Sequence, residues 1–392
     1  MNRRNNMKRI AIPLLLSLSL LLSGCQNTDT GSNGGDSAST GAESVAVIDT
    51  AALFSDRDLD GSYDESAAVH IQLEGETAVC DSDAVSIDGS RITLLDEGTY
   101  LVSGALTDGQ IVVDAGDTDK VQIVLASASL TCADSAAIYS KSADKVFLTL
   151  AEGTENTLTN GGSYTAIDKN NIDSVVFSKT DLTLKGSGSL TIDAQARHGV
   201  VSKDELTING GTFTVDSVDD CLHSGGALAV TGGTFTLSSG DDAIHSDDAV
   251  TIRAGEFSIP YCYEGVEGLS VTVEDGTFEI TAYDDGFNAA GGADSSGFAA
   301  SEDSFITVNG GTITVVSDGD CLDSNGDLTV NGGTLDLTCN GNGNTALDCS
   351  GSYTNNGGSV TTNDGSETNS GGRSGNRLEE EREPLPSGRP KA

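Results

Sequence analysis

The sequence predicts an all-β protein, a parallel β-helix with about 22 residues in each coil. Three observations predict this fold: a short phrase that recurs at a nearly fixed spacing, apolar residues that alternate within each copy, and a glycine at one place in every copy. The clearest copies run from Leu206 to Val215 and from Leu228 to Leu237, and later copies begin at Val250, Val271, Ile306 and Leu328.

The shared glycine of the phrase marks the length of the repeat. Successive copies of it are spaced by 22, 22, 21, 35, 22 and 25 residues, at Gly211, Gly233, Gly255, Gly276, Gly311, Gly333 and Gly358. Glycine readily adopts positive φ, so Asn209-Gly-Gly211 predicts a sharp corner between two strands. A β-sandwich also contains short alternating strands, but it does not require a corner glycine every 22 residues.

Within each copy the apolar residues have a period of two, which indicates strands with one buried face. Leu206 and Ile208 precede the corner, and Phe213 and Val215 follow it. Stacked copies would bring like residues about 4.8 Å apart in ladders inside the solenoid. Weaker copies extend this pattern toward the N-terminus and bring the expected total to nine or ten coils: Leu182–Ile192, Val146–Leu158, Val121–Leu130 and Ile92–Leu101.

The N-terminus predicts export. Arg3, Arg4, Lys8 and Arg9 precede an apolar run, 10–22, that is short for a membrane span but typical of a signal peptide. Leu22-Ser-Gly-Cys25 resembles the lipobox of bacterial lipoproteins, so we expect Cys25 to be lipidated and the chain to be extracytoplasmic, held at the cell surface by its lipid anchor alone. The expected organisation is a signal peptide (1–24), a lipidated cysteine with a flexible tether (25–47), a β-helix domain (48–362) and a disordered C-terminal tail (363–392).

The charge excludes nucleic acid as a partner. The formal net charge is −40, with 60 acidic and 20 basic residues, so few cations are present to neutralise phosphates. Affinity for cations follows, although many of the acids serve solubility. Seven cysteines remain after Cys25, and the pair in one coil that the sequence favours for a disulfide is Cys339 with Cys349.

A second recurring phrase places acidic residues in two columns. If Leu222 and its equivalents Ile244, Val266, Phe287 and Leu322 point inward, polar residues on either side form ladders. The first column holds Asp220, Asp242, Glu264, Asp285 and Asp320. The second holds His223, His245, Glu267, Asn288, Asp323 and Asp348.

We expect the two columns to line a shallow trough and to bind calcium. Stacked carboxylates repel one another unless they are protonated or bridged by cations, and hard oxygen ligands suit Ca²⁺. The expected ligands are Asp220, Asp242, Glu264, Glu267, Asp285, Asp320 and Asp323. Two alternatives remain: aspartates that only shape turns and face water, and zinc at His223 and His245, for which His198 is a less suitable third ligand because it aligns with Asp220.

Two further segments bear on the site. About thirteen extra residues, 289–301, leave the solenoid beside the trough, where a loop is often functional. Asp56–Gly61 resembles the start of a calcium loop but has Ala67 at the twelfth position, so we expect a capping segment there.

Tyrosines near the trough can stack on sugar rings. The expected carbohydrate-binding residues are Tyr261, Tyr263, Tyr283, Asn288, His223 and His245, and Phe287 is expected in the core.

Three phrases together resemble a known family: Phe54-Ser-Asp-Arg-Asp-Leu59 with Tyr63-Asp-Glu65, then 145–156, then 285–292. The chain is similar, over about residues 48–362, to the clostridial-type β-helix carbohydrate-binding domain family. The resemblance implies a right-handed parallel β-helix like that of pectate lyases, bound calcium, and binding of cellulose-like or uronic-acid polysaccharides without catalysis. Tyr263-Glu264 departs from the Asp-Asp pattern of the other copies, which bears on the ligand set.

The sequence therefore favours a surface lipoprotein that binds polysaccharide, with calcium bridging the trough to uronate groups. The alternatives are a calcium-dependent polysaccharide lyase and a passive adhesin or spacer. A lyase needs a base, commonly Lys or Arg, and the basic residues nearest the trough lie outside the acidic phrases: Lys169, Arg197, Lys203 and Arg253. We expect no enzymatic activity and assign no catalytic residue.

Overall fold

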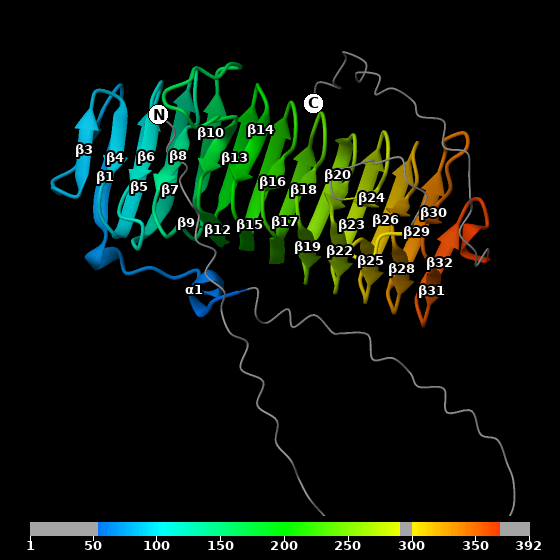
Figure 1. Cartoon of the computed structure of the whole chain (residues 1–392). Coiled ribbons are helices and arrows are strands. Elements are labelled where there is room, and N and C mark those ends of the chain that lie inside the picture. Colours follow the sequence, from blue (N-terminus) through cyan, green and yellow to red (C-terminus); the bar gives the residue numbers. More distant parts are fainter. Residues whose placement is uncertain (1–53, 291–299, 369–392) are drawn as a thin grey trace, which may run out of the picture. The chain divides into compact units, whose positions relative to one another are not determined.

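The computed structural model describes residues 54–290 and 300–368. This part of the chain is a parallel β-solenoid of about 11 turns with about 24 residues per turn and almost no helix (Figure 1). The expected fold class is confirmed. The signal peptide, Cys25, the tether, most of the 289–301 insertion and most of the C-terminal tail lie outside the described residues.

Each turn contributes one strand to a 12-stranded sheet. Its strands, in spatial order, are β3 (Val85–Asp88), β4 (Arg91–Leu94), β6 (Gln110–Asp114), β8 (Ile138–Ser142), β11 (Ser174–Ser178), β14 (His198–Ser202), β16 (Leu222–Ser224), β18 (Ile244–Ser246), β21 (Val266–Gly268), β24 (Phe287–Ala289), β27 (Leu322–Ser324) and β30 (Leu347–Cys349). Every neighbouring pair is parallel except β3 and β4, which form an antiparallel hairpin at the N-terminal end.

The strands on either side of the glycine corner make a 20-stranded sheet. Before the corner come β1 (Val69–Gly75), β5 (Gly98–Leu106), β7 (Lys120–Cys132), β9 (Lys145–Leu150), β12 (Asp181–Gly186), β15 (Leu206–Ser217), β17 (Leu228–Ser238), β19 (Ala249–Ile252), β22 (Ser270–Val273), β25 (Phe305–Val308), β28 (Asp327–Val330) and β31 (Tyr353–Asn355). After it come β10 (Glu155–Asn160), β13 (Ser189–Ala194), β20 (Glu256–Cys262), β23 (Thr277–Ala282), β26 (Thr312–Ser317), β29 (Thr334–Cys339) and β32 (Ser359–Thr362), while the long strands β5, β7, β15 and β17 run through both positions.

The repeat register is as predicted in the regular coils. Leu206 pairs with Leu228 and Phe213 with Phe235, one repeat apart. The corner glycine has positive φ, +90° at Gly211. The N-terminal copies are less regular, and Ile92–Leu101 is not a strand pair around a corner: it straddles β4 and β5, which belong to different sheets. The irregular copies are also where the structure has more coils than the nine or ten expected.

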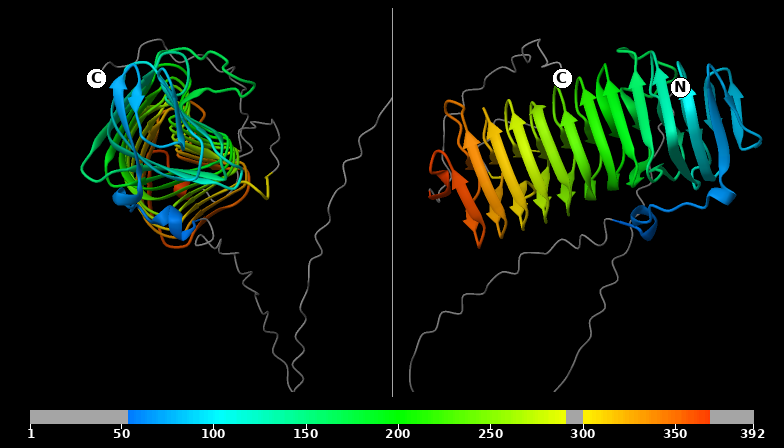
Figure 2. Two further views of the ribbon diagram at one scale, coloured as in Figure 1. Left: turned by 90° about the vertical axis from the view of Figure 1, so that its left-hand side faces the viewer. Right: turned by 180° about the vertical axis from the view of Figure 1, so that it is seen from behind.

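Stacked side chains fill the interior. Four phenylalanine rings form a ladder in which neighbouring centroids lie 5.3, 4.7 and 4.6 Å apart, from Phe213 through Phe235 and Phe257 to Phe278. Phe287 meets the last ring edge-on at 5.6 Å and is 1% exposed, so its expected place in the core is confirmed. The view along the solenoid shows this interior enclosed by the stacked turns (Figure 2).

The segment 54–60, here called the N-terminal strap, lies along the side of the solenoid and not over its end (Figures 1 and 2). It contains α1 (Asp56–Leu59), and a 3-10 helix, η2 (Glu65–Ala67), follows it. Asp58 is 2% exposed and forms an ion pair with Lys145 of β9 at 2.8 Å, while Thr183 of β12 donates to it at 2.6 Å. The expected capping role is therefore wrong in its position: the N-terminal end is closed by β3 and by β2 (Ala78–Val79), which pairs antiparallel with β1.

At the other end the ordered chain continues past residue 362. Asn363 exchanges two hydrogen bonds with the backbone of Cys339, and Asp364 accepts from the backbone of Ala346. These residues, with the 3-10 helix η3 (Ser366–Thr368), cover the last coil. Cys339 and Cys349 are free thiols, because they end strands of different sheets, so the favoured disulfide is wrong.

Across the two described ranges, none of the helices has the length and apolar character needed to cross a bilayer.

Candidate cation and carbohydrate site

The structure brings the two polar columns together on the 12-stranded sheet. In the second column, His223 pairs with His245, His245 with Glu267, Glu267 with Asn288, and Asn288 with Asp323, which in turn pairs with Asp348. The first column lies beside it, since Asp220 contacts His223 three residues on. The register of both columns follows from the inward position of Leu222 and its equivalents. We call the two columns together the acidic row.

The acidic row is more buried than expected. The five first-column carboxylates are only 2–6% exposed, and Glu267, Asn288 and Asp323 are similarly buried. The oxygen-rich walls expected of the shallow trough are therefore almost completely buried. Any ion or ligand held by these oxygens would be largely withdrawn from water.

Part of the first column supports the backbone of the next coil. The backbone N–H of Asp242 donates to Oδ1 of Asp220 at 3.1 Å, and that of Asp320 donates to Oδ1 of Asp285 at 2.6 Å. The backbone N–H of Thr345 donates to Asp320 in the same way. These aspartates thus satisfy buried donors between coils and do not simply face water.

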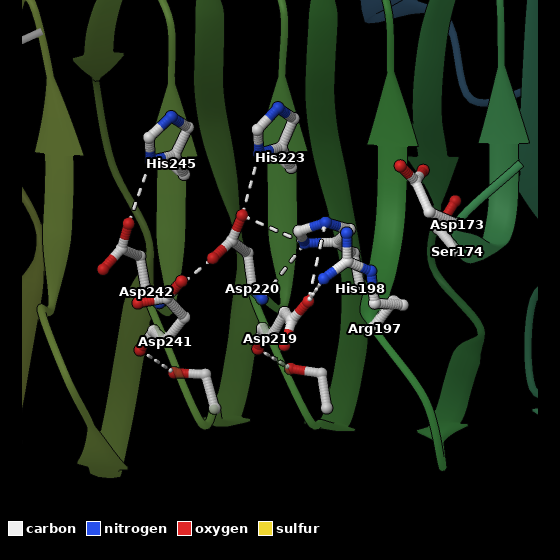
Figure 3. Close-up of polar contacts among 12 residues, drawn as sticks. Asp173, Ser174, Arg197, His198, Asp219, Asp220, His223, Asp241, Asp242 and His245 are labelled. Atoms are coloured by element: carbon white, nitrogen blue, oxygen red, sulfur yellow. Dashed lines mark hydrogen bonds and ion pairs between the residues drawn. The ribbon is translucent and has the colours of Figure 1, made fainter. Parts of the chain in front are cut away.

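Histidines occupy the N-terminal part of the row (Figure 3). Nδ1 of His198 and Nδ1 of His223 lie 3.1 and 2.8 Å from the same oxygen, Oδ2 of Asp220. Nδ1 of His245 lies 2.9 Å from Oδ2 of Asp242 and 2.6 Å from Oε2 of Glu267. As expected from the alignment, His198 occupies the position of Asp220 one coil earlier, since Val200 pairs with Leu222.

Charge in this part of the row is balanced by the histidines. Burial raises the pKa of Asp220, but hydrogen bonds with His198 and His223 outweigh it and hold that pKa below its usual value. Burial lowers the pKa of His245, yet Asp242 and Glu267 together raise it to about 11. His245 is therefore a positive partner for two buried carboxylates at neutral pH.

Farther along, the side chains of the row offer oxygen ligands: Glu264, Glu267, Asp285, Asn288, Asp320, Asp323 and Asp348. Burial raises the pKa of Glu264 well above its usual value, and the charges of Asp242 and Glu267 raise it further. Burial likewise raises the pKa of Asp285, with Asp323 and Glu264 adding to the effect. A bound cation would remove this repulsion.

Asn288 provides an independent sign of a cation position. Its side chain is 3% exposed, and its amide nitrogen donates to Oε2 of Glu264 at 3.0 Å. Its Oδ1 atom is buried without a hydrogen-bond partner. A buried acceptor without a donor, among carboxylates of raised pKa, fits a hard cation such as Ca²⁺. Asp320, Asp323 and Asp348 form a second oxygen group, with one ligand atom of each within 4.8 Å of the others.

The predicted sugar-stacking tyrosines come together in part. The rings of Tyr263 and Tyr283 lie 6.0 Å apart at 36° on adjacent coils, and Tyr283 is 43% exposed. Tyr261 is half-buried, one residue before the end of β20. Tyr283 is thus exposed and Tyr263 half-buried, and in sequence Tyr263 lies next to Glu264 and Tyr283 lies near Asp285.

The basic residues considered as the base of a lyase do not belong to the acidic row. Arg197 forms an ion pair with Asp219 at 2.9 Å, and the guanidinium of Arg253 lies 5.7 Å from the ring of Phe54 in the strap. Nζ of Lys203 lies 5.9 Å from the ring of Phe177, and Lys169 is exposed in the loop before β11. Only Arg197 adjoins the acidic row, and it is paired with a carboxylate.

Asp247 lies beside the acidic row and is not among the residues expected from the sequence. Its Oδ1 lies 3.3 Å from Nε2 of His245. The signal was present, since residues two apart on a strand share a face and His245 precedes Asp247 by two.

Fold and site together define the chain as a parallel β-helix protein with a buried acidic row and an exposed tyrosine, Tyr283, near it. It belongs to the carbohydrate-binding domain-containing protein family, whose model matches residues 88–343 and 240–374. The family expected from the three phrases is thereby confirmed.

The chain is also similar to two further proteins. A carbohydrate-binding domain-containing protein of Acetivibrio thermocellus is 37% identical over 135 residues, which is 34% of this chain and 47% of the relative, so the match spans about half of that protein. A solved structure, described as the polysaccharide lyase-like protein from C. thermocellum in a gadolinium derivative, is similar at 24% identity with a TM-score of 0.46. That similarity covers 76% of this chain and 94% of the other.

Proposed function

We propose that this protein binds polysaccharide along the acidic row, with calcium held by its oxygen-only part. Membership of the carbohydrate-binding family supports polysaccharide as the ligand. The buried Oδ1 of Asn288, which has no hydrogen-bond partner, supports calcium as the bound ion. The chain would supply Glu264, Glu267 and Asp285 with Asn288 at one position. Uronate carboxylates would complete the coordination of the ion, which explains how an acidic protein can hold an acidic sugar.

Binding without catalysis fits the positions of the basic side chains. Abstraction of a proton next to a uronate needs a base within hydrogen-bond reach of the sugar. Arg197, beside the row, is tied to Asp219, and Arg253 lies against the strap. We therefore propose a binding protein and not a lyase.

The test of this proposal is retention of the purified protein on insoluble polygalacturonate, with and without a calcium chelator. We expect retention with calcium, loss of retention with chelator, and weakened retention in Glu264→Gln. Glu279→Gln, at an exposed position of β23, is the matched control and should behave as the wild type. Retention of the wild type that is the same with and without chelator would refute the calcium bridge.

The same ion should stabilise the fold. A ligand that binds only the folded state at 100 times its Kd adds about 2.7 kcal/mol to the free energy of unfolding. The melting temperature measured without any sugar therefore tests ion binding independently of polysaccharide binding. A melting temperature unaffected by chelator would contradict the calcium proposal and leave calcium-independent sugar binding standing.

We further propose that the protein is a cell-surface lipoprotein anchored through Cys25, which lies outside the described residues. The basic residues, the apolar run and Leu22-Ser-Gly-Cys25 support this location. Metabolic labelling with a radioactive fatty acid should mark the wild type and not Cys25→Ser, which should appear in the medium. Labelling of Cys25→Ser to the wild-type level would disprove the anchor.

A further inference from the structure

We propose that His223, His245 and Asp247 form a site for a divalent transition-metal ion of the zinc class, distinct from the oxygen-only part of the acidic row. The two imidazole rings come from adjacent coils, on β16 and β18. They are stacked almost parallel, with centroids 4.6 Å apart and an interplanar angle of 6°. Parallel stacking points equivalent nitrogens of the two rings in the same direction, as Figure 3 shows.

Carboxylates hold the inner nitrogen of each ring. Nδ1 of His223 is 2.8 Å from Asp220, and Nδ1 of His245 is 2.9 Å from Asp242. Histidines that bind metal usually donate their other ring N–H to a carboxylate, which fixes the ring and makes the remaining nitrogen more basic. The Nε2 atoms, which face away from these carboxylates in Figure 3, are then the metal-binding nitrogens.

The third ligand is an oxygen from the exposed side. Oδ1 of Asp247 lies 3.3 Å from Nε2 of His245, and one ligand atom from each of the three residues lies within 4.8 Å of the others. Zinc binds nitrogen and oxygen at about 2.0–2.2 Å, so ligand atoms around a tetrahedral ion lie about 3.4 Å apart. Atoms as much as 4.8 Å apart need to approach one another by up to about 1.4 Å, and the two stacked imidazole rings must tilt so that both nitrogens point at the ion. The Asp247 side chain is 62% exposed and can make this movement, while the imidazoles are 16% and 13% exposed.

The donor set decides between metals. Two imidazoles and one carboxylate suit zinc and its neighbours, whereas Ca²⁺ prefers six to eight oxygens. The negative charge of Asp220, Asp242 and Glu267 favours a positive charge at this point, which a metal ion supplies. Three protein ligands leave a fourth position for water or for an oxygen of a bound ligand.

The experiment is calorimetric titration of chelator-treated protein with Zn²⁺, repeated with Co²⁺ to record the visible spectrum of a tetrahedral ion. We expect one ion per chain, with binding at least about tenfold weaker in His223→Asn and in Asp247→Asn. His70→Asn and Asp248→Asn are the matched controls, since His70 lies on β1 and Asp248 is the exposed neighbour of Asp247. Both should bind as the wild type does.

Equal Zn²⁺ affinity in the wild type and in Asp247→Asn would overturn the proposal. So would complete displacement of Zn²⁺ by an equal concentration of Ca²⁺, because it would place the ion among the oxygens. Asp247 is exposed, so its variant decides the question even if His223→Asn fails to fold. No sugar is present, and failure here leaves the polysaccharide proposal untouched.

Discussion

Replacing Phe257 by alanine should lower the free energy of unfolding by about 3–5 kcal/mol. The ring is 2% exposed and lies between Phe235 and Phe278, at 4.7 and 4.6 Å. Its removal leaves a cavity in the middle of the aromatic ladder, which stacked strands on both sides cannot close. Chemical denaturation followed by circular dichroism measures the loss.

The control for this prediction is Tyr283→Ala, which removes an aromatic ring that is 43% exposed. It should change stability by less than about 1 kcal/mol, because an exposed ring buries little on folding. Equal losses for the two variants would mean that the ladder contributes no special stability.

Replacing Asp58 by alanine should have an effect of similar size, about 3–5 kcal/mol, because it leaves the Lys145 ammonium, only 13% exposed, without its counter-charge. Asp58 is buried under the strap, where Ser55 closes a capping box on it and Lys145 and Thr183 bind its other oxygen. Lys185, 1% exposed, also depends on the strap, since its Nζ donates to the backbone oxygen of Arg57 at 2.6 Å. Asp56→Ala, on the exposed side of the same helix, is the control and should change stability little.

The same ion pair predicts a dependence on pH. Burial raises the pKa of Asp58, but hydrogen bonds from Lys145, Ser55 and Thr183 outweigh it and bring the pKa to about 2, from an ordinary value of 3.8. A carboxylate with a lowered pKa in the folded state stabilises the protein above its ordinary pKa, and this contribution disappears as the pH falls through the lower value. The difference in stability between wild type and Asp58→Ala should therefore shrink between about pH 4 and pH 2. A difference that stays constant over that range would exclude the charged form of Asp58 as its source.

The sequence predicts the solenoid because each repeat carries its own strand, corner and inward residues within 22 positions. The same local pattern predicts the polar columns, since Leu222 and Ile244 fix the positions of His223 and His245. It also places Phe287 in the core. These features depend only on neighbours along the chain and on the next coil.

Other features depend on contacts that no repeat encodes. Glu264 and Asp285 are only 6% and 2% exposed, and periodicity gives the side of the strand on which a residue lies but not how deeply it is buried. The position of the strap depends on Lys145, Thr183 and Asn209, which lie in different copies. Cys339 and Cys349 share a coil but end strands of different sheets, so closeness in sequence was misleading.

The strap also constrains the order in which the molecule can assemble. Its hydrogen bonds to Thr183, Lys185 and Asn209 join residues 125, 128 and 150 positions apart. Chains emerge N-terminus first, so the strap exists long before its partners and must stay undocked until β9, β12 and β15 have stacked. A shift of the register by one turn would separate these partners, so the strap can dock only on coils that are in the native register. The strap, although it is among the first residues of the solenoid, thus docks last and stabilises only turns that have stacked in the native register.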